Sequence, residues 1–208
     1  MKPLHYLITA GPTREFLDPI RFLSNRSSGK MGYALARAAA RHGRVTLISG
    51  PVTLSPPAGV AFIPVTSAQD MAVAVARHFA TADVVIMAAA VCDFRPRRIV
   101  AGKIKKTTFT GPLDLAPTVD VLATLGRRKR RQLLIGFAAE TDDLLANAQV
   151  KLRRKNLDLI VANHARAMEA DTNQVTLLYR DGRVEALPEM SKPRVAAAIL
   201  RRVNALRT

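Results

Sequence analysis

The sequence predicts an α/β fold: a Rossmann-like, doubly wound, mainly parallel sheet with an added β arm and β-hairpin that serve as a dimerisation region. Short apolar runs alternate along the chain with longer stretches that carry apolar residues at helical spacing. The run at residues 83–90 is apolar almost throughout, which is typical of a parallel strand buried on both faces. Ser67 and Asp70 form a capping box in front of an apolar helical pattern.

The predicted strands and helices largely alternate along the chain. Strands are predicted at residues 4–10, 44–49, 59–65, 83–90, 132–137 and 157–162. Helices are predicted at residues 30–42, 71–80, 118–131, 141–156 and 191–206. Gly43 is the C-cap signal of the first helix, and Thr141 is the predicted N-cap of the fourth. In a fold of this kind, ligands bind outside the carboxyl ends of the strands.

Two segments interrupt this alternation within what we predict to be a single domain over residues 1–208. Residues from about 91 to 117 are too polar and too interrupted for a core helix, and we interpret them as an extended arm or hairpin over the site. Residues from about 174 to 187 read as a β-hairpin, because Asp181 and Gly182 form its turn. Both segments would leave exposed strand edges in a monomer, so a symmetric homodimer is predicted.

Composition excludes several classes of protein. A chain of 208 residues with 49% hydrophobic residues can bury a proper core and is not disordered. No apolar run is long enough to span a membrane, and the N-terminal residues lack a cleavable signal pattern, so a cytoplasmic location is expected. A single cysteine, Cys92, excludes an internal disulfide and a cysteine-based metal cluster.

The net charge of +16 is compatible with two kinds of partner, a nucleic acid or an anionic small molecule. Much of the charge lies in two runs, residues 127–131 and 151–155, and such runs are more often solvated helix ends than binding sites. Three Tyr, seven Phe and no Trp leave little for base stacking. Nucleic-acid binding is therefore the less favoured interpretation.

A polar loop of about 20 residues joins the first strand to the first helix, and long loops of this kind are usually functional. It is not a P-loop, because Ser24 and Met31 stand where that motif requires glycine and Ser or Thr, and it lacks the dinucleotide glycine fingerprint. A polar loop that ends at a helix N-terminus favours anions. The candidate groups for substrate phosphate or carboxylate are Gly11, Thr13, Arg14, Arg21, Asn25, Ser27, Ser28 and Lys30.

Other polar or small residues follow the later strands. Residues 88–90 are alanines, which either pack tightly or let a ligand approach the backbone. Lys103, Lys105 and Lys106 lie in the arm, where they either guard a solvated edge or reach an oxyanion. The sequence shows no nucleophile–base pair, so the chemistry favoured is nucleotidyl or phosphoryl transfer to a carboxylate by positioning and charge neutralisation.

Several motifs together resemble one family, phosphopantothenoylcysteine synthetase (phosphopantothenate–cysteine ligase). They are ITAGPTRE, DPIRFLSNRSSGKMG, AAAVCDF, KIKK, GFAAET, KLRRKNLDLIVAN and NQVTLL, and they cover nearly the whole chain in order. The resemblance implies a Rossmann-like homodimeric ligase of coenzyme A biosynthesis that uses CTP and a divalent cation such as Mg²⁺. In that reaction 4′-phosphopantothenate is activated as an acyl-cytidylate with release of pyrophosphate, and the amine of L-cysteine then forms the amide.

The resemblance also implies roles for particular residues. It places Asn25 at the activated acyl group and makes Asn25 and Lys103 the catalytic candidates. The implied nucleotide-binding positions are Met87, Ala88, Ala89, Asp93, Lys103, Val119, Asp120, Val121, Leu122, Phe137, Lys151 and Lys155. Val119 and Cys92 depart from the family pattern, which usually has proline and alanine there. The metal ligands are not assigned, with Asp93 and Glu140 as candidates.

Three questions stay open at this point. The base preference, CTP or ATP, depends on backbone contacts that the sequence does not reveal. Most bacterial members are fused behind a flavin-dependent decarboxylase, so a separate phosphopantothenoylcysteine decarboxylase is expected unless the sequence is part of a longer protein. The competing function is a basic Rossmann-like nucleic-acid-binding module, which only the charge supports.

Overall fold

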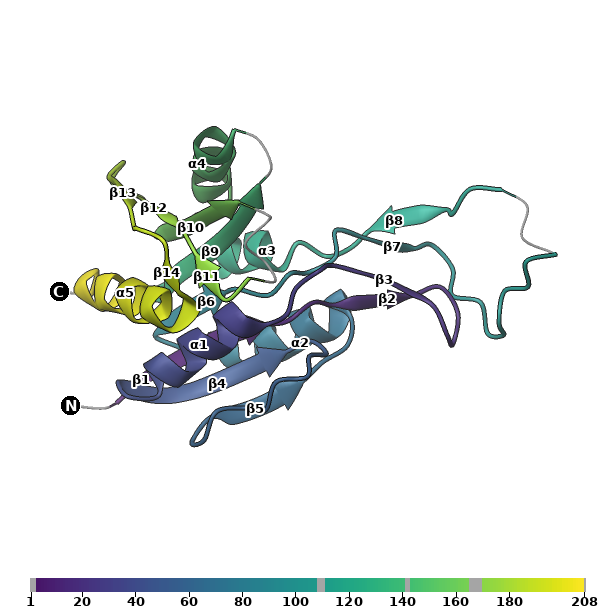
Figure 1. The fold of residues 1–208 in the computed structure, drawn as a ribbon, viewed down its shortest axis with the longest axis horizontal. Helices are drawn as coiled ribbons and strands as arrows, with labels where there is room; N and C mark the ends of the chain where they lie inside the picture. The colour runs from purple at the N-terminus through teal and green to yellow at the C-terminus, as the bar shows by residue number, and fades with distance from the viewer. Residues whose placement is uncertain (1–2, 108–110, 141–142, 165–169, 208) are drawn as a thin grey trace.

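A computed structural model describes residues 3–107, 111–140, 143–164 and 170–207. In these residues an eight-stranded sheet has the order β13-β12-β10-β9-β6-β1-β4-β5 (Figure 1). Its strands are β1 (Leu4–Ala10), β4 (Gly43–Ser49), β5 (Ala61–Pro64), β6 (Val84–Met87), β9 (Leu133–Glu140), β10 (Leu159–His164), β12 (Thr176–Tyr179) and β13 (Val184–Ala186). The six strands from β5 to β10 are parallel, and their order is that of a doubly wound dinucleotide-binding fold. The predicted fold class is confirmed.

Helices cover both faces of the sheet. They are α1 (Lys30–Ala39), α2 (Ala68–Phe79), α3 (Val121–Arg128), α4 (Leu144–Arg154) and α5 (Lys192–Ala205). Successive side chains of a strand point to opposite faces, so Tyr6 and Ile8 pack in the core under α1 and α5, whereas Leu7 packs in the core under α2, α3 and α4. No helix in the described ranges has the length and apolar character needed to cross a membrane.

Several element boundaries in the structure differ from the predicted ones, each for a physical reason. The first helix ends at Ala39 with Ala40 as its C-cap, so Gly43 is not its C-cap signal but the first residue of β4. A Cβ on Gly43 would lie 2.2 Å from the carbonyl oxygen of Leu4, so glycine is needed there for close strand pairing. The third predicted helix begins only at Val121, because Asp120 caps it. The capping box at Ser67 is confirmed.

The fourth helix begins at Leu144 after Asp143, which has a left-handed φ of 46°, and the predicted cap Thr141 lies outside the described residues. The late hairpin is confirmed as β12 and β13 with its turn at residues 180–183. It is not separate from the main sheet, however, because β12 pairs antiparallel with β10. Only β13 is left as an outer edge on that side.

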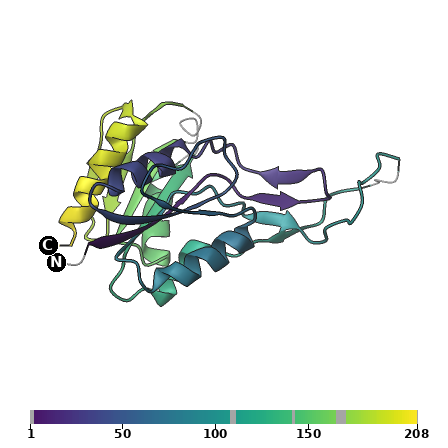
Figure 2. The ribbon, with the colours of Figure 1, turned by 90° about the horizontal axis from the view of Figure 1, so that it is seen from below.

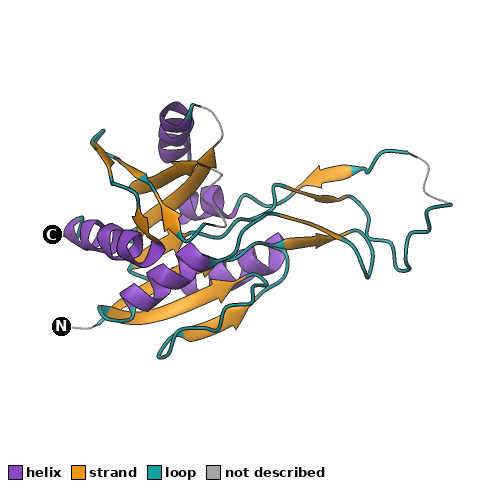
Figure 3. Ribbon diagram, in the orientation of Figure 1, coloured by secondary structure: helices purple, strands orange, loops and turns teal. Residues whose placement is uncertain are grey.

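Two thin hairpins extend away from the sheet and lie side by side in both ribbon views (Figures 1 and 2). One joins β2 (Arg14–Phe16) to β3 (Phe22–Ser24), and the other joins β7 (Phe94–Pro96) to β8 (Leu115–Pro117). We call the described residues 14–24, 91–107 and 111–117 together the projection. Much of it is loop rather than strand (Figure 3). The arm predicted at about 91–117 is therefore present, but it points away from the sheet rather than folding back over it.

Candidate nucleotide and substrate site

The site lies where the strand order reverses, between β1 and β6. The loops that follow these two strands are tied together: Thr13 N–H donates to Ala90 O at 3.2 Å, and Ala90 N–H donates to Gly11 O at 2.9 Å. Gly11 and Gly29 both have positive φ, 72° and 75°, which lets the chain turn sharply into and out of the loop. A crevice at this position is where open α/β sheets bind ligands.

A cavity of about 340 Å³ occupies this crevice. Asn25 lies on its wall and is held there because its Nδ2 donates to Ala90 O at 3.0 Å. The α1 N-terminus, with Gly29 and Lys30, contributes backbone N–H groups that have no partner within the helix. The same wall carries Ser27, so three of the predicted substrate-binding residues, Asn25, Ser27 and Lys30, meet here.

A second cavity of about 190 Å³ adjoins the first and shares part of its lining, including Asp93, Phe137 and Lys151. Its wall brings together residues that the resemblance implied for the nucleotide: Met87, Ala89, Asp93, Val119, Asp120, Val121, Leu122, Phe137, Lys151 and Lys155. Ala88 lines the larger cavity instead. Residues from β6, β9, α3 and α4 thus meet at one end of the sheet, although they are far apart in the sequence.

Asp120 and Lys155 form the floor of the smaller cavity as an ion pair, with Nζ 2.8 Å from Oδ2. Asp120 also caps α3 by accepting from the Ala123 N–H at 2.9 Å. Burial alone would raise the pKa of Asp120, but the hydrogen bonds from Lys155 and Ala123 lower it overall. Asp120 is therefore an anion that holds Lys155 at the cavity wall, next to Lys151 one helical turn earlier.

The remaining residues of the first loop lie outside the lining of both cavities. Thr13 is fully buried, and its Oγ1 accepts from the Cys92 N–H at 2.9 Å, so it joins the two loops. The Arg14 guanidinium lies 4.5 Å from the centre of the Phe22 ring, on the projection. Gly11, Arg21 and Ser28 are likewise absent from the lining of the two cavities.

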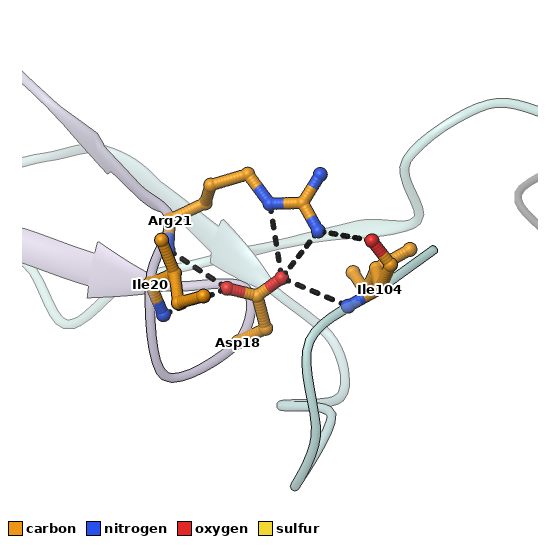
Figure 4. A network of polar contacts seen from close by, with 4 residues as sticks. All are labelled: Asp18, Ile20, Arg21 and Ile104. Atoms are coloured by element: carbon orange, nitrogen blue, oxygen red, sulfur yellow. Dashed lines mark hydrogen bonds and ion pairs between the residues drawn. The ribbon is translucent and has the colours of Figure 1, made fainter. Parts of the chain in front are cut away.

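Arg21 and the segment that carries Lys103 meet instead on the projection (Figure 4). Asp18, whose side chain is fully buried, accepts from the Arg21 guanidinium at 2.6 Å and from the Ile104 N–H at 3.1 Å, and Arg21 in turn donates to Ile104 O at 2.6 Å. Burial opposes the charge of Asp18, but hydrogen bonds from Ile20, Arg21 and Ile104 hold its pKa well below the usual range. Lys103 is thus anchored in the projection and lines neither cavity of the same chain.

Sequence reasoning gave no site role to Asn163, Asn173 or Lys192, which line the larger cavity, although Asn163 and Asn173 lie in the motifs KLRRKNLDLIVAN and NQVTLL. Asn173 belongs to a small ribbon of β11 (Thr172–Asn173) and β14 (Met190–Ser191), and Lys192 follows β14 as the first residue of α5. Lys192 is only 4% exposed, and burial together with nearby Lys30 lowers its pKa. For Lys192, the only signal in the sequence was a lysine at the start of the terminal helix, which is a common surface feature.

Within the described part of the chain, no group of three or more His, Cys, Asp or Glu residues could hold a metal ion. Asp93 lines both cavities, and the side chain of Glu140, the other candidate ligand, lies outside the part that the structure describes. Mg²⁺ is commonly bound by one or two carboxylates together with water and substrate phosphates. The donors at this site therefore fit a cation that arrives with a nucleotide, with Asp93 as its protein ligand.

Comparison with known proteins gives consistent results. The chain is 52% identical over 208 residues to the coenzyme A biosynthesis bifunctional protein CoaBC of Bacillus subtilis, and 48% identical over 210 residues to that of Mycobacterium tuberculosis. These alignments cover 97% and 93% of this chain but only 51% and 50% of the relatives, so it spans about half of their length. The crystal structure of a C-terminal domain of CoaBC superposes with a TM-score of 0.86 at 46% identity, over 99% of this chain and 96% of that one.

The fold itself recurs more widely. A Cab2 variant in complex with phosphopantothenate-cysteine superposes with a TM-score of 0.82 at 20% identity, which shows the shared fold alone. Residues 1–206 match the model of the DNA/pantothenate metabolism flavoprotein C-terminal domain. Because that match spans nearly the whole chain, the protein belongs to this family.

Proposed function

We propose that this chain is a phosphopantothenate–cysteine ligase of coenzyme A biosynthesis that uses CTP. The observation that carries the proposal is the pair of connected cavities at the switch point. The smaller cavity gathers the residues implied for the nucleotide, and the larger one presents Asn25 and the N-terminus of α1. The close relatives named CoaBC, each about twice as long as this chain, support the same assignment.

In the proposed first step, the carboxylate oxygen of 4′-phosphopantothenate attacks the α-phosphorus of CTP, and the bond to the leaving pyrophosphate breaks. Lys151 and Lys155 line the nucleotide cavity and neutralise phosphate charge there. A divalent cation such as Mg²⁺, held by the phosphates and Asp93, supplies further charge neutralisation when bound. No covalent intermediate on the protein is required, which agrees with the lack of a nucleophile–base pair in the sequence.

In the proposed second step, the amine nitrogen of cysteine attacks the acyl carbon, CMP leaves with the electron pair of the broken bond, and the amine loses a proton. Asn25 is the side chain that we place at the acyl group. Its Nδ2 already donates to Ala90 O, which fixes the side chain and leaves Oδ1 to accept from the attacking amine. A neutral amide also avoids trapping the substrate carboxylate as an ion pair.

The experiment is a pyrophosphate-release assay with CTP or ATP, with phosphopantothenate present, and with or without cysteine. Release should require phosphopantothenate and reach about one turnover per site without cysteine, because activation precedes attack by the amine. Strict dependence on cysteine from the first turnover would exclude a stable acyl-nucleotide. Tight, salt-sensitive binding to random nucleic acid with no turnover would favour the alternative function.

The exposed apolar side chains of the projection support a homodimer. Ile20, Phe94 and Ile99 are 59%, 57% and 68% exposed, and the other exposed apolar side chains of the projection are Phe22, Val100, Leu113 and Leu115. An extended surface of this kind is typical of a protein–protein interface. Light scattering should give twice the monomer mass of 22.6 kDa at micromolar concentration, and full activity at the monomer mass would contradict the proposal.

A dimer also explains the position of Lys103. Because Lys103 and Arg21 lie on the projection and outside the cavities of their own chain, we place them at the cavities of the partner copy. An equal mixture of Asn25→Ala and Lys103→Gln subunits, allowed to exchange, should then recover about a quarter of the wild-type sites, each in a mixed dimer. If mixing restores no activity, Asn25 and Lys103 act within one subunit.

The same proposal includes a cytoplasmic location and a decarboxylase as the next enzyme, since the product is a cysteine amide whose carboxyl group remains. The relatives are named as bifunctional proteins, and this chain spans only about half of their length. The decarboxylase is therefore either a separate protein or the rest of a longer one.

A further inference from the structure

One wall of the larger cavity comes from the β11–β14 ribbon, of which only Asn173 lies in a motif of the sequence analysis, NQVTLL. Thr172 pairs with Ser191 and Asn173 with Met190 in this two-stranded ribbon. The backbone N–H of Lys192 donates to Asp171 O at 3.0 Å and so fixes the start of α5 against the ribbon. As a result, Asn173 and Lys192 both line the cavity that contains Asn25.

The wall is strongly cationic and faces a helix N-terminus. Lys192 is 4% exposed, and Lys30, the first residue of α1, lines the same cavity. Asp171 contacts Lys30 at 2.6 Å, but its own side chain is 87% exposed, so this ion pair is well solvated and easily exchanged. The α1 N-terminus adds the positive end of the helix dipole.

A second, independent observation points to a ligand. Asn173 is 4% exposed, and its Oδ1 has no hydrogen-bond partner among the residues that the structure describes. A buried polar atom without a partner carries a substantial free-energy cost, so such atoms usually await water or a ligand. A carboxamide presents either donor or acceptor by a half turn of its terminal group, and Asn173 can therefore donate to a phosphate oxygen.

The residues that both cavities share indicate which part of the ligand lies next to Asn173 and Lys192. If the smaller cavity holds the nucleoside, the triphosphate passes Asp93, Phe137 and Lys151, which both cavities share, and enters the larger one. The larger cavity must then hold the phosphates beyond the α-phosphate as well as the substrate carboxylate near Asn25. The groups there that are suited to a concentrated negative charge are Lys30, Lys192 and the α1 N-terminus.

We propose that Lys192 and Asn173, together with Lys30, bind the phosphoryl groups that leave as pyrophosphate. This inference rests on the proposed ligase function and gives roles to Asn173 and Lys192, to which the sequence analysis assigned none. When the bond between the α- and β-phosphates breaks, pyrophosphate takes the electron pair and gains negative charge, and Lys192 and Lys30 neutralise it. Lys30 exchanges Asp171 for phosphate oxygens in the process. A phosphate group next to Lys192 also favours its charged ammonium form, which burial disfavours.

The test measures the binding of inorganic pyrophosphate to the intact protein by calorimetry, and the KM values for CTP and phosphopantothenate. Lys192→Met should weaken pyrophosphate binding and raise the KM for CTP, each on the order of tenfold, because a charge-assisted contact is lost. The KM for phosphopantothenate should change less than about twofold. Lys192→Arg should keep most of the affinity, and Asn173→Ala should cause a smaller change of the same pattern, about threefold.

Arg194→Gln is the matched control. Arg194 lies on the same helix but lines a different groove, with Leu187 and Arg201, so its replacement should change neither pyrophosphate affinity nor KM. Circular dichroism and thermal unfolding of each variant separate a folding defect from a binding defect. If Lys192→Met fails to fold, Lys192→Arg and Asn173→Ala still provide the comparison.

Each other outcome has a defined meaning. If phosphopantothenate and inorganic phosphate lose affinity while pyrophosphate does not, these residues hold the phosphate of the substrate, and the assignment to pyrophosphate is wrong. If neither affinity changes in Lys192→Met or Asn173→Ala, the inference is wrong while the ligase function stands. If the wild type binds pyrophosphate through Lys192 but shows no ligase turnover with any nucleotide, the proposed function fails and the phosphoryl site remains.

Discussion

The sheet buries its apolar side chains under helices on both faces, whereas the projection leaves Ile20, Phe94 and Ile99 more than half exposed. One ion pair from each region shows the same contrast. In the sheet region, Lys129 and Asp158 pair at 2.8 Å with side chains only 7% and 18% exposed, while Arg97 and Asp114 on the projection are 59% and 70% exposed.

The difference indicates that the sheet region buries its apolar side chains within one chain, whereas the projection does not. The two cavities and the residues implied for the nucleotide, apart from Lys103, belong to the sheet region or to the place where the projection joins it. Arg21 and Lys103 belong to the outer projection, where Asp18 binds the Arg21 guanidinium and the backbone N–H of Ile104, the residue after Lys103 (Figure 4). Activity should therefore depend on two regions that can be perturbed separately.

The largest effect should come from Asn25, which lines the larger cavity just after the β2–β3 hairpin. We expect Asn25→Ala to lower amide formation on the order of a hundredfold or more, the scale of losing one hydrogen bond that stabilises the transition state. Arg26→Ala, next to it in the sequence, should be much milder. Product formation followed in single turnovers checks this, and near-normal rates for Asn25→Ala would remove the residue from the mechanism.

The next largest difference between the two regions should appear in the free energy of unfolding. Asp158 also accepts from the Leu134 N–H at 2.8 Å, so Asp158→Asn breaks a network that is largely buried. We expect a loss of about 2 kcal/mol in the free energy of unfolding. Asp114→Asn on the projection should cost less than about 0.5 kcal/mol, since that pair is solvated. Denaturant titration measures both, and equal losses would contradict the comparison.

The outer projection should affect catalysis more moderately. Lys103→Gln should slow nucleotide-dependent activation on the order of tenfold, which corresponds to about 1.4 kcal/mol, because charge on the α-phosphate and pyrophosphate is less well neutralised. Lys106→Gln, in the same lysine-rich segment, is the control and should be mild. Similar behaviour of the two variants in a pyrophosphate-release assay would show that the segment is only a charged edge.

The sequence predicted the parallel strands and the helices well, because buried strands such as residues 4–10 are continuous apolar runs with recognisable caps between them. It did not predict the β2–β3 hairpin, whose strands of three residues lie in a polar loop without alternation. Most of the nucleotide-binding positions could be predicted only through the resemblance to a family. Asn173 and Lys192 were missed because only tertiary structure brings a short ribbon to the cavity.

The smallest effect should be at Cys92, which lies where the projection leaves the sheet. Its side chain is 6% exposed, and its Sγ lies 3.5 Å from Thr13 O. Burial raises the pKa of the thiol, the hydrogen bond to Thr13 opposes this only in part, and the group is therefore a protonated packing residue at neutral pH. We expect Cys92→Ala to keep most of the ligase activity and to lose about 1 kcal/mol of stability, as for a small buried truncation.

Alkylation of Cys92 in the wild type should be slow near pH 7 and should accelerate as the pH rises toward the raised pKa, since only the thiolate reacts. A nucleotide in the adjoining cavity should leave that rate unchanged, because Cys92 does not line either cavity. Rapid alkylation at neutral pH, or complete loss of activity in a folded Cys92→Ala protein, would show that the thiol takes part in the reaction. The junction between the two regions would then take part in the chemistry and not only in packing.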